Sequence, residues 1–217
     1  MTGHIAALYR HPVKGFTPEG LQQARLTAGE AFPCDRLYAV ENGHSGFDPK
    51  APAHLPKQKF TVLMSIPRVA QAQTRYDEAA EMLHATAEGL PPFQGRLSEE
   101  IGRNAFAEWL EALLAEDRRG PLKVLSAEGH RFMDSRSGDV SIVNLASVRD
   151  LEQRIGRPLD PLRFRANLYV EGWPAWVEND WTGKALMAGF ARVEVVKPIV
   201  RCAATHVDPA TAQRDNE

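Results

Sequence analysis

Short apolar runs separated by turn residues dominate the first part of the chain, and this spacing is typical of β-strands. Such runs fall between residues 5 and 27, and β-branched and aromatic residues return at 36–40 and 60–64. The stretch 45–56 is rich in Pro, Gly, Ala and His and predicts a loop. The pattern therefore predicts a small β-rich unit near the amino terminus.

Two helices interrupt the strand pattern. From Ser98 onward the apolar residues recur at the three-and-four spacing of one buried helix face. These residues are Phe106, Trp109, Leu110, Leu113 and Leu114. A second helix is predicted around Val148 to Ile155, where Ser147 and Asp150 resemble an N-terminal cap and a first-turn acid.

Further strands are predicted on either side of these helices. The candidates are 69–76, 81–87, 122–126, 167–170 and 191–196. The last of them leads through Lys197-Pro198 to Arg201 and Cys202. The expected fold class is mainly β with a few helices packed on it, an α+β arrangement.

Composition narrows the functional classes. The chain has 217 residues, of which 43% are hydrophobic and 25% charged, enough to bury a sizeable core. The 26 basic and 28 acidic residues nearly cancel, so no overall field attracts nucleic acid or an anionic membrane. No secretory signal or membrane-spanning run is recognisable, which predicts a cytoplasmic location.

Cys202 is the first candidate for chemistry. The chain has two cysteines, too few for a disulfide framework, a four-cysteine zinc site or an iron–sulfur cluster. Cys202 follows a predicted strand and stands beside Arg201, and a neighbouring cation favours the thiolate that binds metals. A buried, inert thiol fits the same spacing. Cys34, after Phe32-Pro33, is predicted to have a packing role.

A row of polar residues is the second candidate. In the segment 163–167, strand alternation would point Arg163, Arg165 and Asn167 to one face. Two guanidinium groups and an amide suit a phosphate or a polar heterocycle. An exposed strand face with surface salt bridges fits equally well.

Other polar residues give weaker signals. Lys14-Gly15 ends a predicted strand, where a lysine can contact a phosphate, although a solvated turn lysine is the simpler interpretation. Five histidines without metal-ligand spacing are predicted to be surface or core residues. They are His11, His44, His54, His130 and His206.

Taken in order, several of these segments resemble the MOSC family, named after the carboxy-terminal domain of molybdenum cofactor sulfurases. The segments are Tyr9 to Gly15, Asp35-Arg36, Arg163 to Asn167, and Arg201-Cys202 with Val207-Asp-Pro209. The resemblance covers nearly the whole chain. It implies an amino-terminal β-barrel-like domain over residues 1–118 and a MOSC β-barrel domain over 119–217, apparently truncated at its carboxy-terminal end.

Within that family the arrangement most resembles the mitochondrial amidoxime-reducing component and its bacterial relatives, which reduce N-hydroxylated compounds with a molybdenum cofactor. The resemblance implies Cys202 as molybdenum ligand and, with Asp208, as a catalytic residue. It implies a further set of residues around the phosphate, the pterin and the metal. This set is Lys14, Arg36, Arg163, Arg165, Asn167, Arg201 and Thr205.

The sequence departs from the family pattern at three positions. Family members often have a hydroxyl or thiol residue in place of Gly15, proline in place of Ala166, and glycine in place of Ala212.

Three functions remain open. The first is a reductase of N-hydroxylated small molecules that binds Mo-molybdopterin. Its electrons would come from a separate flavin reductase or ferredoxin-like partner, because the chain has no dinucleotide fingerprint. The second is a sulfur carrier with a persulfide on Cys202, and the third is a cofactor-binding protein without turnover. Nothing in the sequence supports binding of pyridoxal phosphate, nucleic acid or a membrane.

Overall fold

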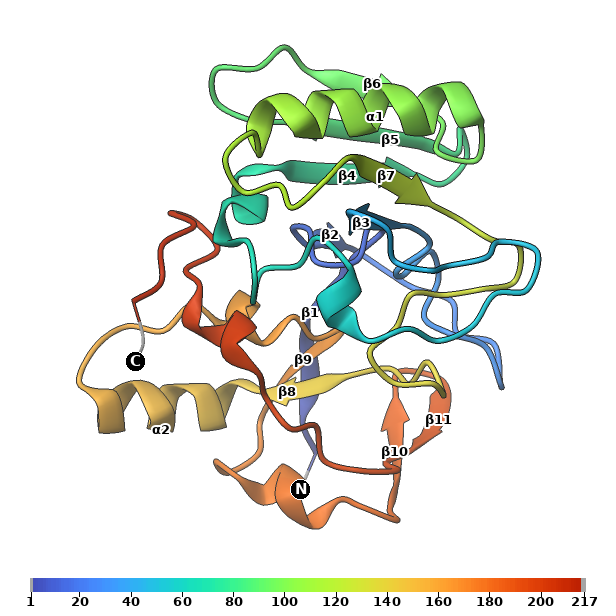
Figure 1. Ribbon diagram of the computed structural model, residues 1–217. Helices are drawn as coiled ribbons and strands as arrows, with labels where there is room; N and C mark the ends of the chain where they lie inside the picture. The colour runs from blue at the N-terminus through green and yellow to red at the C-terminus, as the bar shows by residue number, and fades with distance from the viewer. Residues whose placement is uncertain (1, 216–217) are drawn as a thin grey trace.

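The computed structural model describes residues 2–215, and in that range its regular secondary structure is mostly β-strand, with two α-helices (Figure 1). The strands are β1 His4–Arg10, β2 Glu19–Leu21, β3 Ala39–Asn42, β4 Gln73–Asp77, β5 Met82–Thr86, β6 Phe93–Gly95, β7 Leu122–Leu125, β8 Ile142–Asn144, β9 Leu168–Glu171, β10 Ala185–Ala188 and β11 Ala191–Glu194. The α-helices are α1 Glu100–Leu113 and α2 Leu145–Ile155. Short 3₁₀ helices are η1 Lys57–Lys59, η2 Pro67–Gln71, η3 Pro161–Phe164, η4 Val177–Asp180 and η5 Ala203–His206. The expected mainly-β class is confirmed.

The β-barrels that the family resemblance implies need correction, because the strands of residues 2–215 form four separate sheets and none of these closes into a barrel. The largest has the order β2-β1-β9-β8, in which β8 and β9 run parallel and the other pairs are antiparallel. The remaining sheets are β3-β7, β4-β5-β6 and β10-β11. Because β1 pairs with β9 and β3 with β7, both halves of the chain contribute strands to common sheets. A domain boundary near residue 118 stays a prediction.

Helix α1 covers the upper sheet in Figure 1, and its apolar face supplies much of the core. Phe106 and Leu110 on this helix have no exposed side-chain surface. Phe106 lies 5.9 Å from Phe16 and 5.0 Å from Phe93, measured between ring centroids. The helix predicted from the three-and-four spacing is therefore confirmed, and it closes the core beneath the residues that follow β1.

Two strand predictions in the first half need correction. Residues 60–64 form no ladder beyond one bridge from Phe60 to Glu41, and Val62 accepts hydrogen bonds from Ser65 and Ile66 in a turn. Their side chains fill the core, so the run is apolar without being a strand. The segment 69–76 begins as η2, because Pro67 occupies its first turn, and becomes a strand only at Gln73.

The second half needs corrections as well. Helix α2 begins earlier than predicted: Asn144 caps it, accepting a hydrogen bond from the Ala146 N–H at 3.1 Å, while Ser147 lies inside the helix. The predicted strand from 191 to 196 ends at Glu194. No helix within residues 2–215 combines the length and apolar character needed to cross a bilayer.

Candidate functional site

The site begins where the chain leaves β1 and runs beside residues 35–38. The His11 N–H donates to Asp35 Oδ1 at 2.6 Å, and the Arg36 N–H donates to the His11 carbonyl at 2.7 Å. Two residues on, the Lys14 N–H donates to the Tyr38 carbonyl at 2.8 Å. Arg36 has a left-handed backbone with φ +50°, which turns its side chain out of the strand direction. These bonds fix Lys14 and Arg36 in one neighbourhood.

Asp35 and His11 lie completely buried beneath this turn. Burial, together with the charges of Arg165 and Arg36, lowers the pKa of His11 to about 3, so the imidazole is neutral. Burial alone would raise the pKa of Asp35. The Arg36 guanidinium and the hydrogen bond from the His11 N–H outweigh burial, so that the Asp35 pKa falls below its usual value and the carboxylate stays ionised. Asp35 also accepts a hydrogen bond from Arg36 Nη1 and orients that guanidinium.

Lys14 is not the solvated turn lysine that sequence reasoning favoured. Its side chain is 5% exposed, and its Nζ donates to the Phe132 carbonyl at 2.9 Å and to Asp134. Burial lowers the pKa of Lys14, and the Asp134 carboxylate acts against that shift. The loop that carries Phe132 is itself fixed, because the Phe132 N–H donates to the Arg36 carbonyl at 2.9 Å.

Gly15 explains one departure from the family pattern. Its φ is +89°, and a Cβ atom added there would lie 2.6 Å from the Thr61 carbonyl oxygen. A hydroxyl or thiol residue at this position would need the chain around Thr61 to move. The glycine therefore belongs to the local packing of this chain.

Arg165 supplies a third positive charge. The backbone at Arg165 is left-handed with φ +51°, and its carbonyl accepts a hydrogen bond from Arg36 Nη2 at 3.4 Å. Burial lowers the pKa of Arg165 to about 10, with Arg36 acting in the same direction, so the group remains charged at neutral pH. Within residues 2–215 its guanidinium, on a half-buried residue, forms no hydrogen bond or ion pair. An unpaired, partly desolvated cation attracts an anion.

Arg163 and Asn167 do not share a strand face with Arg165. Residues 161–164 form η3, because Asp160 caps it and Pro161 starts it, and β9 begins only at Leu168. Arg163 is buried and binds Asp208 and Asp215. The Asn167 amide donates to the Tyr9 carbonyl at 3.2 Å and accepts from Ser141. The side chains of Arg163 and Asn167 therefore connect segments of the protein. They lie beside the cation cluster, but both already have partners within the chain.

Cys202 lies on a separate segment that packs against η3. It does not follow a strand directly, because the chain from Val195 to Cys202 has no regular structure. Cys202 is a free, half-buried thiol at the start of η5, where its carbonyl accepts hydrogen bonds from the backbone and hydroxyl of Thr205, each at 3.0 Å. Arg201 donates to the Phe164 carbonyl at 3.1 Å. Thus Arg201 and Arg163 both connect the Cys202 segment to η3, the element directly before Arg165.

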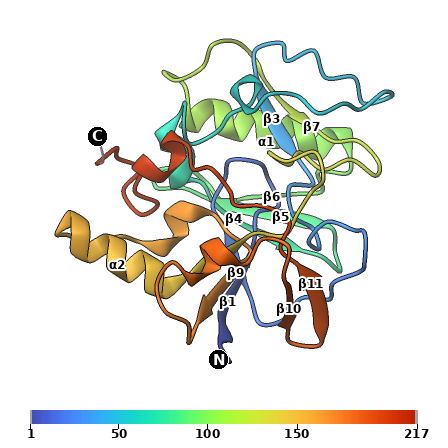
Figure 2. The same ribbon diagram turned by 90° about the horizontal axis from the view of Figure 1, so that it is seen from below.

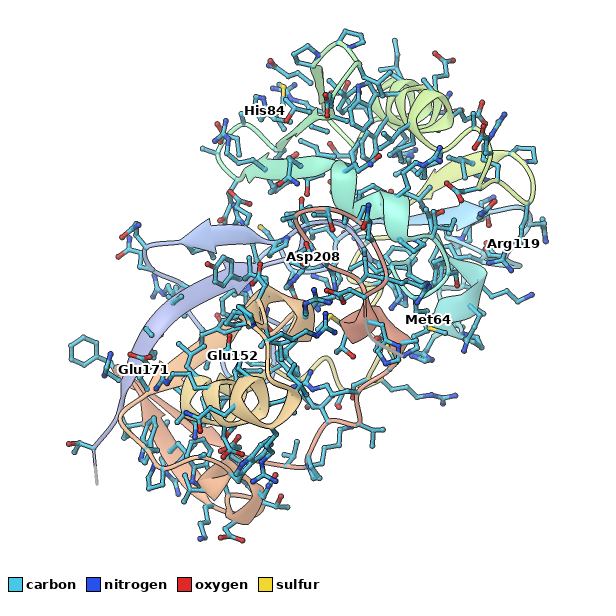
Figure 3. The ribbon with its side chains drawn as sticks, turned by 90° about the vertical axis from the view of Figure 1, so that its left-hand side faces the viewer. Met64, His84, Arg119, Glu152, Glu171 and Asp208 are labelled. Carbon is cyan, nitrogen blue, oxygen red and sulfur yellow. The ribbon has the colours of Figure 1, made fainter. Side chains whose placement is uncertain are left out.

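Asp208 lies near the middle of the molecule, between the α1 and α2 regions (Figure 3). One of its oxygens accepts from Arg163 Nη2 at 2.7 Å, and the other accepts from the backbone of Ala210 and Thr211. The turn ends at Ala212, whose φ of +60° is the left-handed conformation that suits the glycine of family members. Arg214 then donates to the Met64 carbonyl, which places the red terminal segment beside η2 in Figure 2.

The structure thus brings Lys14, Arg36 and Arg165 into one cluster and connects it through η3 to Cys202. Sequence reasoning missed three neighbours of the cluster: His11 as a contact of Asp35, and Asp134 and Lys57, which approach each other to 4.0 Å. Both Asp134 and Lys57 lie outside strands and α-helices, so periodicity gives no signal for them. A group of cations with a free thiol suits a ligand that combines an anionic group with a soft metal.

Comparisons with known proteins identify the family to which the chain belongs. Residues 2–118 match the MOSC N-terminal beta barrel domain, and residues 129–217 match the MOSC domain. A molybdenum cofactor sulfurase of Caenorhabditis elegans is 24% identical over 97% of this chain and 30% of its own length. One from Caenorhabditis briggsae is 31% identical over 50% of this chain and 15% of its own length. Mitochondrial amidoxime-reducing component 1 of Mus musculus is 29% identical over 35% of this chain and 22% of its own length.

The chain therefore spans less than a third of the length of these curated relatives. The two domain matches together extend over most of its residues, in the order that the sequence motifs predicted. On these matches, the chain belongs to the family of proteins in which a MOSC N-terminal β-barrel domain precedes a MOSC domain.

Proposed function

We propose that this chain binds a molybdenum cofactor and reduces N-hydroxylated compounds to amines. The observation that carries the proposal is the half-buried guanidinium of Arg165, which has no partner among residues 2–215, lies next to Arg36 and is connected through η3 to a free thiol. An anionic pterin phosphate suits the cations, and a soft thiolate suits molybdenum. When bound, the cofactor supplies the redox chemistry, and the protein supplies orientation and charge.

In this proposal Lys14, Arg36 and Arg165 hold the phosphate. Asp35 orients Arg36 through its carboxylate. Because His11 is neutral, it does not compete with Arg36 for the charge of that carboxylate. Cys202 is the protein ligand to the metal. Thr205 supports it indirectly, because its backbone N–H and hydroxyl hold the Cys202 carbonyl and fix the start of η5.

Arg163 and Asp208 have a positioning role in the proposed mechanism. Their ion pair joins η3 to the chain after η5, so it sets the distance between the cations and the thiol. This assignment differs from direct cofactor contact by Arg163 and from direct catalysis by Asp208, which the family resemblance implies. A positioning role fits the 2.7 Å hydrogen bond from Arg163 to Asp208, which engages both side chains within the protein.

A reduction assay tests the proposal. The cofactor-loaded protein, supplied with a reduced viologen dye, is expected to convert an amidoxime to the corresponding amidine. With NADH alone we expect no turnover, because the proposed donor is a separate flavin reductase or ferredoxin-like protein. A molybdenum-loaded protein that reduces none of several N-hydroxylated substrates would contradict the reductase proposal.

A sulfur carrier is the second candidate, favoured because the similarity to a molybdenum cofactor sulfurase extends over 97% of this chain. In that function the half-buried Cys202 holds a persulfide. Incubation with a cysteine desulfurase and its substrate cysteine then adds the mass of one sulfur atom to the protein. That mass gain together with no reduction of N–OH substrates would favour the carrier. A loaded protein with neither activity would indicate cofactor binding without turnover.

A further inference from the structure

Asp134 lies at the centre of the positive charges of the candidate site. Its carboxylate accepts a hydrogen bond from Lys14 Nζ through Oδ1, and its Oδ2 lies 4.0 Å from Lys57 Nζ. Burial would raise the pKa of Asp134, but Lys14, Lys57 and Arg36 together lower it. The carboxylate is therefore ionised and bound to the cluster in the protein without ligand.

The two partners of the main ion pair differ in exposure. The Lys14 side chain is 5% exposed, whereas the Asp134 side chain is 63% exposed. Lys14 also keeps its hydrogen bond to the Phe132 carbonyl, independently of Asp134. Rotation of Asp134 into solvent would thus leave Lys14 in place as a buried ammonium without a counter-ion. Such an ammonium binds an incoming anion strongly.

We infer that the Asp134 carboxylate occupies the position of the ligand's anionic group, that an anionic ligand binds by displacing it, and that Lys57 is a further cation of this site. The inference rests on the proposed function, because it concerns the same phosphate site. It assigns Lys57 to ligand binding and makes Asp134 an internal competitor of the ligand. The position of the ligand's anionic group is defined by the protein itself, because Lys14 and Lys57 already hold the Asp134 carboxylate there.

Displacement has a measurable signature. A competitor that must leave before any anion binds weakens all anions by one common factor. A carboxylate that stayed near the bound ligand would instead weaken a dianion more than a monoanion, because repulsion grows with charge. Two probes of similar shape separate these cases: phenyl phosphate, a dianion at pH 8, and phenyl sulfate, a monoanion.

Calorimetric titration of the full chain, produced in a host that makes no molybdopterin, tests the inference. We expect Asp134→Asn to bind both probes about five-fold tighter or more than the parent, by a similar factor for each. Adding Lys57→Met to that variant should weaken both probes again. Asp139→Asn removes a carboxylate of the same loop that pairs with Lys197, and as the matched control it should leave binding unchanged.

Unchanged or weaker binding in a folded Asp134→Asn variant would overturn the inference, and so would a gain confined to phenyl phosphate. If that variant does not fold, Lys57→Met in the parent decides the matter, since unaltered anion binding there would also overturn it. The readout contains no molybdenum. If the anions bind as expected but the same chain, purified from a host that makes the cofactor, carries no molybdenum, the proposed function is rejected and this inference stands.

Discussion

Arg163 donates to Asp208 at 2.7 Å across the junction between η3 and the chain that follows η5. The same guanidinium binds Asp215, at 2.8 Å through Nη1 and 2.6 Å through Nη2. Because its side chain is only 2% exposed, this network is largely withdrawn from solvent. It connects the Arg165 region with the Cys202 region and gives the candidate site its geometry.

Replacing Arg163 by methionine should therefore destabilise the protein. Two carboxylates would lose their common partner, and we expect a loss of about 2 to 3 kcal/mol in the free energy of unfolding. Arg154→Met is the matched control, since its pair with Asp150 on α2 is exposed and should contribute less than about 0.5 kcal/mol. Urea unfolding of the three proteins measures the difference. Equal midpoints for the two variants would show that the Arg163 network does not hold the junction.

Acid should destabilise the protein through His11. The pKa of this imidazole is about 3 in the folded protein, against an ordinary value of 6.5. The unfolded chain therefore takes up the proton first, so stability is complete above pH 6.5 and falls as the pH decreases toward 3. His11→Gln should lower stability at neutral pH and flatten its dependence between about pH 7 and pH 5.

Urea midpoints at the two pH values test this prediction. His84→Gln on β5 is the control, since this histidine is partly exposed and lies in the region of the molecule that Figure 3 labels at the top. If His11→Gln retains the full acid sensitivity of the parent, another group is responsible.

Removing a charge of the cation cluster should weaken cofactor retention without unfolding the protein. Arg165→Ala loses a guanidinium that has no partner within residues 2–215, so its effect should fall on ligand binding alone. A lost charge-assisted hydrogen bond costs about 1.5 to 3 kcal/mol, or roughly ten- to a hundred-fold in affinity. The molybdenum that remains bound after exhaustive dialysis measures this loss of affinity. Arg192→Ala on β11, an exposed arginine, should behave like the parent; equal losses in both variants would argue against a phosphate at Arg165.

The sequence predicted the helices and strands that form from local patterns of apolar and turn residues. Helix α1 follows from the spacing of Phe106, Leu110 and their neighbours, and β5 from a short run between turns. Residues 60–64 mislead, because an apolar run can fill a core through a turn as well as through a strand. The segment at Arg163 misleads for a different reason: alternation of polar residues is also compatible with a 3₁₀ turn, and the Asp160-Pro161 start decides for the turn.

The candidate site was predictable as a set of residues but not as an arrangement. Lys14, Arg36 and Arg165 were named from motifs, while their proximity depends on hydrogen bonds between segments far apart in sequence. Asp134 and Lys57 carry no motif, and only the folded chain brings them to Lys14. The burial of His11 likewise follows from the turn at Asp35, which no local pattern indicates.

The role of Cys202 is the central claim, and a pair of cysteine variants isolates it. Cys34 packs against the main core and burial raises the pKa of its thiol, so we expect Cys34→Ala to leave metal content unchanged. Cys202 is half-buried at the start of η5, and its hydrogen bonds with Thr205 involve only its backbone. Cys202→Ala should therefore fold as the parent does.

Elemental analysis of the parent, Cys34→Ala and Cys202→Ala proteins, purified from a host that makes the cofactor, tests this claim most directly. We predict that molybdenum copurifies with the first two proteins and is absent from the third, because a methyl group cannot replace the thiolate bond to the metal. Equal molybdenum in Cys202→Ala and the parent would contradict the assignment of Cys202 as the metal ligand.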